Sequence, residues 1–435
     1  MFAYNISIMR SQPRVTSVVK AAVLELSRIK NLQLSRGHMP IENYQEIIRL
    51  LDAPAPLLKT AKLVVEPSQG GSLSVNLFAG ISPRLTRLSL SGWRFRHAQL
   101  PVATNLRVLK LSNSPTDSKM PVDHLISVLS TMAQLQTLHV IDSLGRPQGV
   151  TVNPPAQQAK LPQLTDLAVD SPLSTCIFLF DHIVSPNFIR VSAKYRTDSA
   201  GVDSDISLVR GFAESLGQRV SGPIRWVKLH AHNIKASRSL HSSSSSVDPP
   251  PDLHISLPAL LQLEAVARCF VHSLALTRVE IVYLDWDSSA QLLRTYLGDL
   301  GHLTTIIAGK DATVGLVRAL AVDLSETRSA TDSGSADLKF LALETLRLVQ
   351  WNFEDMHWPR DTVFEMLLTS LTERKKAGFP LAKLIVDACR HVEEELHVVP
   401  LRAVVGNIEW DGQTIYTSES ESEEEHSDDE HYYQW

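Results

Sequence analysis

Cysteine is scarce in this chain of 435 residues: only Cys176, Cys269 and Cys389 occur. A small, odd number of cysteines argues against a secreted domain held by disulfide bonds, and their apolar surroundings suit small core residues. The first residues lack the basic and apolar regions of a signal peptide, and no stretch reaches the ~18 uncharged apolar residues of a membrane span. We therefore expect a cytoplasmic or nuclear protein with no membrane partner.

Familiar catalytic and metal-binding motifs are also missing. Gly309-Lys310-Asp311 lacks the upstream glycine and the following Ser or Thr of a phosphate-binding loop, and no Gly-x-Ser-x-Gly, His-Glu-x-x-His or Cys-x-x-Cys occurs. His230 and His232 would share one face of a strand, but zinc needs three or four ligands. A third ligand would have to come from a neighbouring unit, such as His139 or Asp170. We interpret the histidines as solvent-facing and expect no enzymatic activity, metal or cofactor.

Basic residues are absent after Arg402. The chain has 42 Lys and Arg against 47 Asp and Glu, and ten of these acids follow Arg402, so residues 1–402 carry a net charge of +5. This balance is too mild to indicate a nucleic-acid or membrane-surface protein, and Arg374-Lys375-Lys376 is the one basic run. We do not expect a nucleic-acid partner.

An internal repeat dominates what is present. The spacing Leu-x-x-Leu-x-Leu, with other apolar residues allowed, recurs about twelve times, and the first six steps between copies are 21 to 29 residues long. The last apolar positions of the copies are Leu34, Leu63, Leu90, Leu111, Val140, Val169, Ala193, Leu229, Ile281, Ala308, Leu348 and Val386.

The repeat predicts a fold. The Leu-x-Leu part alternates as a short strand, stacked strands form a parallel sheet, and the segments between them supply crossover helices, as at residues 42–51 and 123–132. We predict an α/β leucine-rich-repeat solenoid, or horseshoe, with a parallel sheet on its concave face and helices on its convex face. Several unrelated α/β domains would explain the alternation of strands and helices but not the recurring spacing.

The length alone suggests about three separate domains. We expect instead one solenoid, preceded by a capping segment and followed by a tail. Residues 1–25 form an N-terminal capping segment, and residues 26–412 form a solenoid of about twelve irregular repeats. Ser-rich and Pro-rich composition predicts disordered loops near residues 237–252 and 325–337. Residues 413–435 form an acidic, disordered tail, and we expect the chain to be a monomer.

Three segments resemble the fungal F-box proteins with degenerate leucine-rich repeats that are numerous in mushroom-forming species. They are Leu-Leu-Asp-Ala-Pro-Ala-Pro-Leu-Leu at residues 50–58, Asn-Leu-Phe-Ala-Gly at residues 76–80 with Pro-Arg-Leu-Thr-Arg-Leu at 83–88, and Val-Val-Gly-Asn-Ile-Glu-Trp-Asp-Gly at 404–412. The resemblance spans roughly residues 15–412.

The resemblance implies the substrate-recognition part of a cullin-type ubiquitin ligase receptor, in which an F-box holds the adaptor and the repeats hold the target. In this sequence the first repeat strand begins near Ile29 and the first tryptophan is Trp93, so no F-box is recognisable. A ligase adaptor is expected as a partner only if an F-box lies upstream. The alternative is a ligase-independent interaction scaffold.

The predicted binding face consists of residues between and just after the repeat leucines. Basic residues outnumber acidic ones there, which favours an acidic protein target, and Arg and Trp are common interface anchors. The alternative is that the charges serve solubility and the tryptophans cap the core. The expected protein-binding residues are Lys62, Arg87, Trp93, Lys110, His139, Arg190, Lys194, Trp226, Lys228, His230, Arg278, Arg347, Trp351 and Lys383. The acids on this face are Asp166, Asp170, Glu280 and Asp387.

Four serines in the tail precede an acidic residue by three positions, a pattern that acidophilic kinases favour. These possible phosphorylation sites are Ser418, Ser420, Ser422 and Ser427. Each phosphate would add about −1.5 to −2 charge. We hypothesise that the tail folds across the basic concave face and competes with an acidic target. The alternative is a solvated tail that aids solubility.

Overall fold

The computed structural model describes most of the repeat body. The described residues are 4–8, 13–35, 41–65, 71–72, 77–80, 82–95, 100, 103–145, 158–185, 190–196, 202–219, 222–230, 233–239, 252–256, 263–274, 276–285, 289–321, 339–353 and 363–412. The tail serines and His232 lie outside them, as do most of the two expected loops.

Strands and helices alternate along the chain. The α-helices are α1 (Pro13–Leu24), α2 (Ile41–Leu50), α3 (Val122–Leu129), α4 (Leu173–His182), α5 (Val202–Arg219), α6 (Leu263–Ser273), α7 (Ala290–Leu297), α8 (Thr313–Leu320), α9 (Val363–Lys376) and α10 (Val399–Arg402). Shorter turns are η1 (Leu26–Arg28), η3 (Leu77–Gly80), η4 (Thr116–Ser118), η5 (Leu276–Arg278), η6 (Lys310–Ala312) and η8 (Glu394–Val398). The helices expected at residues 42–51 and 123–132 are confirmed as α2 and α3.

The main-sheet strands of the first half are β1 (Tyr4–Ile8), β2 (Ile29–Ser35), β3 (Thr60–Val64), β5 (Arg87–Ser91), β7 (Val108–Ser112), β8 (Thr137–Ile141), β10 (Asp166–Pro172) and β12 (Arg190–Arg196). Those of the second half are β13 (Trp226–His230), β14 (Asn233–Ser237), β15 (Leu253–Ser256), β16 (Ile281–Asp285), β17 (Thr305–Ala308), β18 (Thr345–Val349), β19 (Lys383–Asp387) and β20 (Asn407–Trp410). Two small parallel pairs are β4 (Gly71–Ser72) with β6 (Trp93–Arg94), and β9 (Ala159–Lys160) with β11 (Ile183–Val184).

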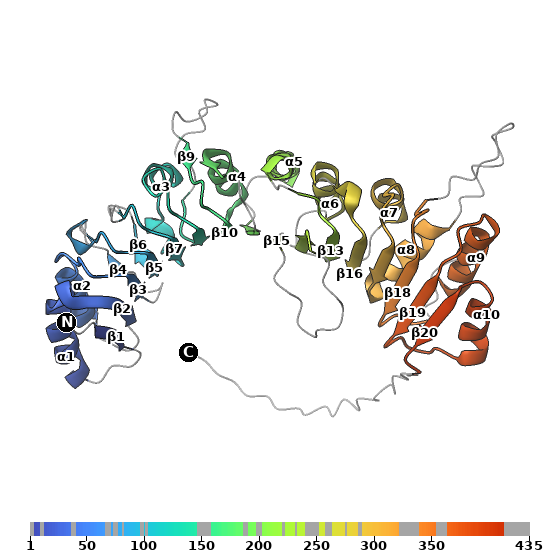
Figure 1. Ribbon diagram of the computed structural model, residues 1–435, viewed down its shortest axis with the longest axis horizontal. Helices are drawn as coiled ribbons and strands as arrows, with labels where there is room; N and C mark the ends of the chain where they lie inside the picture. Colours follow the sequence, from blue (N-terminus) through green and yellow to red (C-terminus); the bar gives the residue numbers. More distant parts are fainter. Residues whose placement is uncertain are drawn as a thin grey trace, which may run out of the picture.

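One large, mostly parallel sheet organises the described chain, so the α/β class and the parallel sheet are confirmed. Its sixteen strands run in the order β1-β2-β3-β5-β7-β8-β10-β12-β15-β14-β13-β16-β17-β18-β19-β20. Figure 1 shows an arc, with the strands along its inner side and the helices along its outer side. Residues 1–25, expected as a cap, include β1 and α1, which extend the sheet and the helical layer beyond β2. None of the described helices has the length and apolar character needed to cross a membrane.

The repeat leucines align across the sheet. Leu34 pairs with Leu63, Leu63 with Leu90, and Leu90 with Leu111, and this line of buried residues continues to Ala193 in β12. The other half has its own line, from Leu229 in β13 to Val386 in β19. Successive side chains of a strand alternate between faces, so in-register pairing buries all these positions on one side.

One copy of the repeat was assigned three residues too early. The structure buries Val282 and Leu284 within β16, whereas Ile281 is half-buried and Leu276 lies in the preceding turn η5. The sequence alignment uses Leu276-x-x-Val279-x-Ile281, and the structure uses Val279-x-x-Val282-x-Leu284. Both segments satisfy the apolar spacing of the repeat. The shift moves Arg278 out of the sheet and into η5, where its side chain is exposed.

The sheet is interrupted at its middle by a meander. Strand β14 pairs antiparallel with both β13 and β15, and β15 then pairs parallel with β12, so two extra strands separate β12 from β13. The expected loop near residues 237–252 therefore begins at the end of β14 and ends just before β15. At its base the Asp252 carboxylate accepts hydrogen bonds from the Ser237 hydroxyl at 2.8 Å and the Arg238 amide at 2.8 Å.

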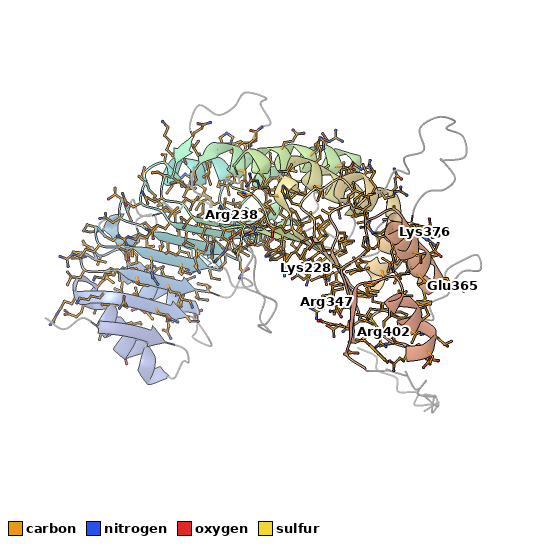
Figure 2. The ribbon with its side chains drawn as sticks, turned by 45° about the vertical axis from the view of Figure 1, so that its right-hand side comes forward. Lys228, Arg238, Arg347, Glu365, Lys376 and Arg402 are labelled. Atoms are coloured by element: carbon orange, nitrogen blue, oxygen red, sulfur yellow. The ribbon has the colours of Figure 1, made fainter. Side chains whose placement is uncertain are left out.

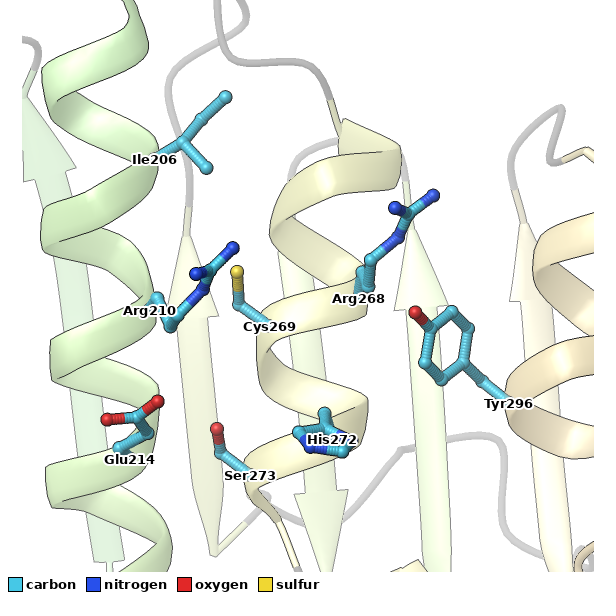
Figure 3. Close-up of a pocket in the computed structure, with 8 residues that line it drawn as sticks. All are labelled: Ile206, Arg210, Glu214, Arg268, Cys269, His272, Ser273 and Tyr296. Carbon is cyan, nitrogen blue, oxygen red and sulfur yellow. The ribbon is translucent and has the colours of Figure 1, made fainter.

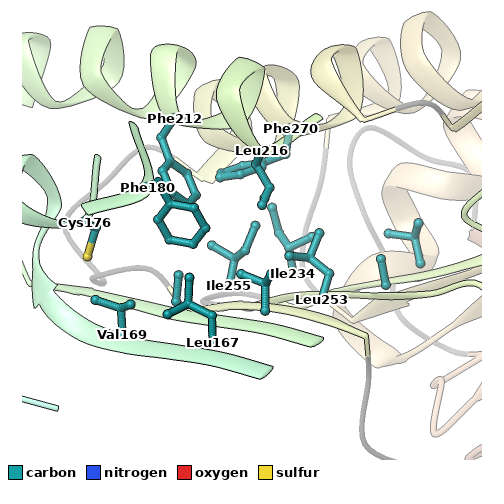
Figure 4. Close-up of a cluster of buried hydrophobic side chains, with 14 of the residues drawn as sticks. Leu167, Val169, Cys176, Phe180, Phe212, Leu216, Ile234, Leu253, Ile255 and Phe270 are labelled. Atoms are coloured by element: carbon teal, nitrogen blue, oxygen red, sulfur yellow. The ribbon is translucent and has the colours of Figure 1, made fainter. Parts of the chain in front are cut away.

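The inserted strands share the core of the regular ones. Figure 4 shows Ile234, Leu253 and Ile255 beneath the aromatic side chains of α4, α5 and α6. The ring of Phe212 contacts Phe180 edge-on, with centroids 4.9 Å apart, and lies 6.2 Å from Phe270. One hydrophobic layer thus continues through the interruption, which keeps the two halves of the sheet together.

The basic run at the end of α9 has a structural role in part. Arg374 is fully buried, and its guanidinium donates to the carbonyl oxygens of Lys339 and Phe340 at 2.9 Å each. Burial lowers the pKa of Arg374. This arginine fastens α9 to the segment that leads into β18, so it does not form a basic surface for nucleic acid.

Two glycines of α5 give a matched test of helix packing. A Cβ at Gly217 would lie 2.1 Å from the Ser273 carbonyl oxygen of α6, whereas a Cβ at Gly211 would have nothing within 4 Å. We expect Gly217→Ala to lower the free energy of unfolding by about 1–3 kcal/mol, because α5 and α6 must separate. Gly211→Ala should raise it by about 0.5–1 kcal/mol through helix propensity. Urea denaturation measures both, and equal effects would contradict the close approach.

Candidate functional site

The inner face of the sheet presents rows of side chains that the register fixes. The middle row contains the residue between the two buried positions of each strand. From β2 to β20 it reads Gln33, Lys62, Ser89, Lys110, His139, Ala168, Ser192, His254, Lys235, Lys228, Tyr283, Ile307, Arg347, Ile385 and Glu409. Figure 2 shows Lys228 and Arg347 on the sheet side of the arc and Glu365 and Lys376 on the helical side.

Most of the predicted basic residues on this face are paired with a carboxylate of the next strand. His139 Nε2 and Arg190 Nη1 lie 3.5 Å and 3.6 Å from Asp166, and Lys194 Nζ lies 3.6 Å from Asp170. In the other half the ion pairs are His230–Asp285, Arg347–Asp387 and Lys383–Glu409. The basic excess inferred from the sequence is therefore largely neutralised along the sheet.

Asp166 is the centre of the first of these networks. The hydrogen bond from His139 lowers its pKa most, and the charges of His139, Arg190 and Lys110 lower it further, against the opposing effect of burial. Asp166 thus remains ionised at neutral pH and holds two neighbouring strands together.

Three exposed cations remain unpaired in the first half of the sheet. Lys62 in β3, Arg87 in β5 and Lys110 in β7 make no ion pair with any described residue. They lie on three consecutive strands, and the intervening residue of the middle row is Ser89. We call these three cations the N-terminal basic patch. It can accept an acidic segment without breaking an existing ion pair.

A second unpaired group occupies the meander. Lys228 of β13 lies directly opposite Lys235 of β14, and Lys235 lies opposite His254 of β15. We call these residues the central base row. Neither lysine makes an ion pair with a described residue, and Lys228 lies over the ring of Tyr283, 6.0 Å from its centroid. Burial, and secondarily the charge of Lys235, lower the pKa of His254, whose Nε2 lies 3.2 Å from Asn233 Oδ1.

The prediction that Trp93 and Trp351 anchor a partner on the inner face is wrong. Trp93 and Trp351 are fully buried, so they belong to the core and cannot contact a partner. The indole of Trp93 donates to the Leu63 carbonyl at 2.9 Å, and Trp351 packs on Phe353 with ring centroids 4.2 Å apart. Trp226 does lie on the inner face of β13, but only 8% of it is exposed, because it packs edge-on against Tyr283.

Lys235 and His254 are not among the residues predicted from the sequence, because no copy of the repeat covers them and the predicted loop near residues 237–252 lies between them. The available signal was the period-two alternation in Asn-Ile-Lys-Ala-Ser at residues 233–237 and Leu-His-Ile-Ser at 253–256. Two alternating runs on either side of a turn-rich segment are typical of a hairpin-like excursion.

A hollow of about 390 Å³ lies on the helical side, between α5, α6 and α7. Figure 3 shows its polar lining, which includes Arg210, Glu214, Arg268, His272 and Tyr296. Two arginines and one carboxylate are part of this lining. Cys269, expected as a core residue, also lines it and is 7% exposed.

The other two cysteines are core residues, as their contexts predict. Cys176 and Cys389 are buried, and the thiol of Cys389 donates to the Leu348 carbonyl at 3.5 Å. Burial raises the pKa of Cys389 to about 11, which keeps the thiol protonated and unreactive at neutral pH. Around His230, as elsewhere in the described chain, no group of three His, Cys, Asp or Glu side chains could hold a metal ion.

Comparison with models of known protein families finds no match to this chain, and comparison with curated proteins finds none either. The functional inference therefore depends on the residues and their geometry.

The opposed lysines of the meander should be destabilising in the folded chain. Replacing Lys235 with Glu converts a like-charge pair with Lys228 into an opposite-charge pair, which we expect to raise the free energy of unfolding by about 0.2–1 kcal/mol. The matched control is Lys235→Glu in a Lys228→Gln background, because it makes the same charge change with no cation directly opposite in β13. Urea denaturation at low salt measures both, and an equal effect of the two substitutions would contradict the opposition.

The ion pairs of Asp166 give a pH prediction. Because the pKa of Asp166 is lowered by folding, its stabilisation is fully present above the unfolded value near 3.8 and is lost as the pH falls through the folded value. Asp166→Asn should therefore cost up to about 1 kcal/mol at pH 7. The difference from the unmodified chain should shrink below pH 3.8 in urea denaturation. A difference independent of pH would show that Asp166 acts through packing instead.

Proposed function

We propose that this chain is a non-catalytic protein-binding module of the leucine-rich-repeat class, whose concave sheet face holds an acidic segment of a target protein. The observation that carries the proposal is the N-terminal basic patch: three exposed cations on adjacent strands, beside a long sheet on which other cations are paired. The aligned apolar positions and the outer helices support assignment to this repeat class.

The polar rows support protein recognition over other classes of partner. A nucleic-acid surface needs a dense array of unpaired Lys and Arg to follow phosphates. Here Arg190, Lys194 and Arg347 are already engaged by carboxylates on the same face. The remaining cations form two separate groups, which suits an acidic peptide segment of limited length.

The family resemblance extends the proposal to the substrate-recognition part of an F-box ligase receptor. A second candidate is a ligase-independent scaffold. Strand β1 and helix α1 belong to the repeat body, since β1 pairs with β2 and α1 packs on α2. These residues are therefore not available to form an adaptor-binding F-box.

Charge reversal at the N-terminal basic patch tests the protein-binding proposal. We expect Arg87→Glu with Lys110→Glu to weaken capture of specific partners from a lysate of the source organism by at least about tenfold, because repulsion replaces attraction on the binding face. Arg49→Glu in α2 with Arg318→Glu in α8 makes the same charge change on exposed helical residues and should leave capture unchanged. Quantitative mass spectrometry of the captured proteins gives the measurement.

Three outcomes are informative. Partners lost only with the inner-face substitutions support the proposal, and equal capture by both variants overturns it. Recovery of a ligase adaptor or cullin with the unmodified chain supports the receptor over the scaffold.

A further inference from the structure

The central base row places like charges where sheet pairing should avoid them. Directly opposed residues of an antiparallel pair have Cβ atoms about 4.5–5.5 Å apart, and like charges there are destabilising. Lys228 and Lys235 occupy such a position, with His254 next in line. The carboxylates around them are already engaged: Asp285 with His230, Asp252 with Arg238 and Glu280 with Arg225. An anion located between the two ammonium groups would remove the repulsion.

The described part of the chain ends at the edge of the sheet that β20 forms. Just after β20, the Asp411 carboxylate accepts a hydrogen bond from the Ala388 amide at 2.7 Å, and this bond fixes the point where the chain leaves the sheet. Between β20 and β13 the basic residues Lys383 and Arg347 are paired with Glu409 and Asp387. The first unpaired cations of the middle row from this end are Lys228 and Lys235.

We propose that the acidic segment 419–430 of this chain docks in cis on the central base row. Residues 413–435 contain eight acidic residues and no Lys or Arg, so their charge is complementary to that of the row. This inference deepens the proposed function, on which it rests, because it assigns an intramolecular occupant to one part of the same face. The N-terminal basic patch remains open to a target.

The length of the tail fits this location. Five strand spacings separate β20 from β13 and seven separate it from β15, which at about 4.8 Å each is roughly 24–34 Å. An extended chain spans up to about 3.3–3.6 Å per residue, so residues 419–425 can reach the row from Gly412. The N-terminal basic patch lies eleven to thirteen spacings away, or about 53–62 Å along the sheet, which is about twice as far as the central base row.

Carbodiimide crosslinking of the full chain tests the contact directly. The carbodiimide adds to a tail carboxylate and activates its acyl carbon. A lysine amine then attacks that carbon, so that an amide forms and the reagent leaves as a urea, which carries the elements of water lost in the condensation. We expect amides between Lys228 or Lys235 and the peptide 403–435, on monomeric chain only, with a yield that falls at high salt. Lys62 and Lys110 are internal controls from the same middle row of the sheet. They should react at least about tenfold less, since they lie about twice as far along the sheet from the end of β20 and the effective concentration of the tail falls with distance.

Equal crosslinking of both lysine pairs, or none to the central base row, would overturn the proposal. A second measurement uses the full chain with the acids of residues 419–430 changed to Asn and Gln. It should bind a labelled peptide of residues 413–435 at least about tenfold more tightly than the unmodified chain, because the internal competitor is gone. Lys228→Gln with Lys235→Gln should abolish that gain, and Arg49→Gln with Arg318→Gln on the helical side should not.

The two proposals fail separately. If crosslinking finds no contact but the Arg87 and Lys110 substitutions still release partners, then only the docking of the tail is wrong. If the crosslinks form and no specific partner depends on the N-terminal basic patch, then the proposed function is wrong and the tail contact remains.

Discussion

Every feature of the inner face depends on one constraint, the in-register pairing of strands that each bury alternate residues. Leu63 must align with Leu34 and Leu90, because a slip by one residue would carry its whole strand's apolar set into solvent. That alignment also fixes the residues between the leucines, so Lys62, Ser89 and Lys110 form a row. Burial on one side of the sheet thus determines the chemistry on the other.

The same constraint explains why the interruption at β13–β15 is tolerated and why it is unusual. Ile234 and Ile255 satisfy the core beneath α5 and α6, so burial is continuous across the two antiparallel pairings. The reversal of direction, however, brings Lys235 opposite Lys228. Packing specifies the register there, and the electrostatic cost follows from it. A sheet face on which two like charges are directly opposed attracts any anion that can reach it.

The apolar spacing was sufficient to predict most of the sheet, because eleven of the twelve copies have the expected strand residues. It failed at Arg278, where two alignments have equally good apolar positions and only the turn at η5 decides between them. The spacing also could not place Trp93 and Trp351, which follow their strands and turn back into the core. The spacing of apolar residues predicts which side chains of a strand are buried. It does not predict the path of the chain after the strand, because that path depends on packing against neighbouring repeats.

Net charge is a weaker guide to the inner face than the apolar spacing is to the fold. A sum treats Arg190 and Lys62 alike, although Arg190 is beside Asp166 and Lys62 has neutral neighbours across the sheet. What distinguishes them is the residue at the same position of the adjacent strand, some 25 residues away in the chain. An anionic partner must displace a carboxylate to use the first cation but only water to use the second. Recognition on such a surface is therefore decided by which cross-strand partners are missing, and not by how many basic residues the face contains.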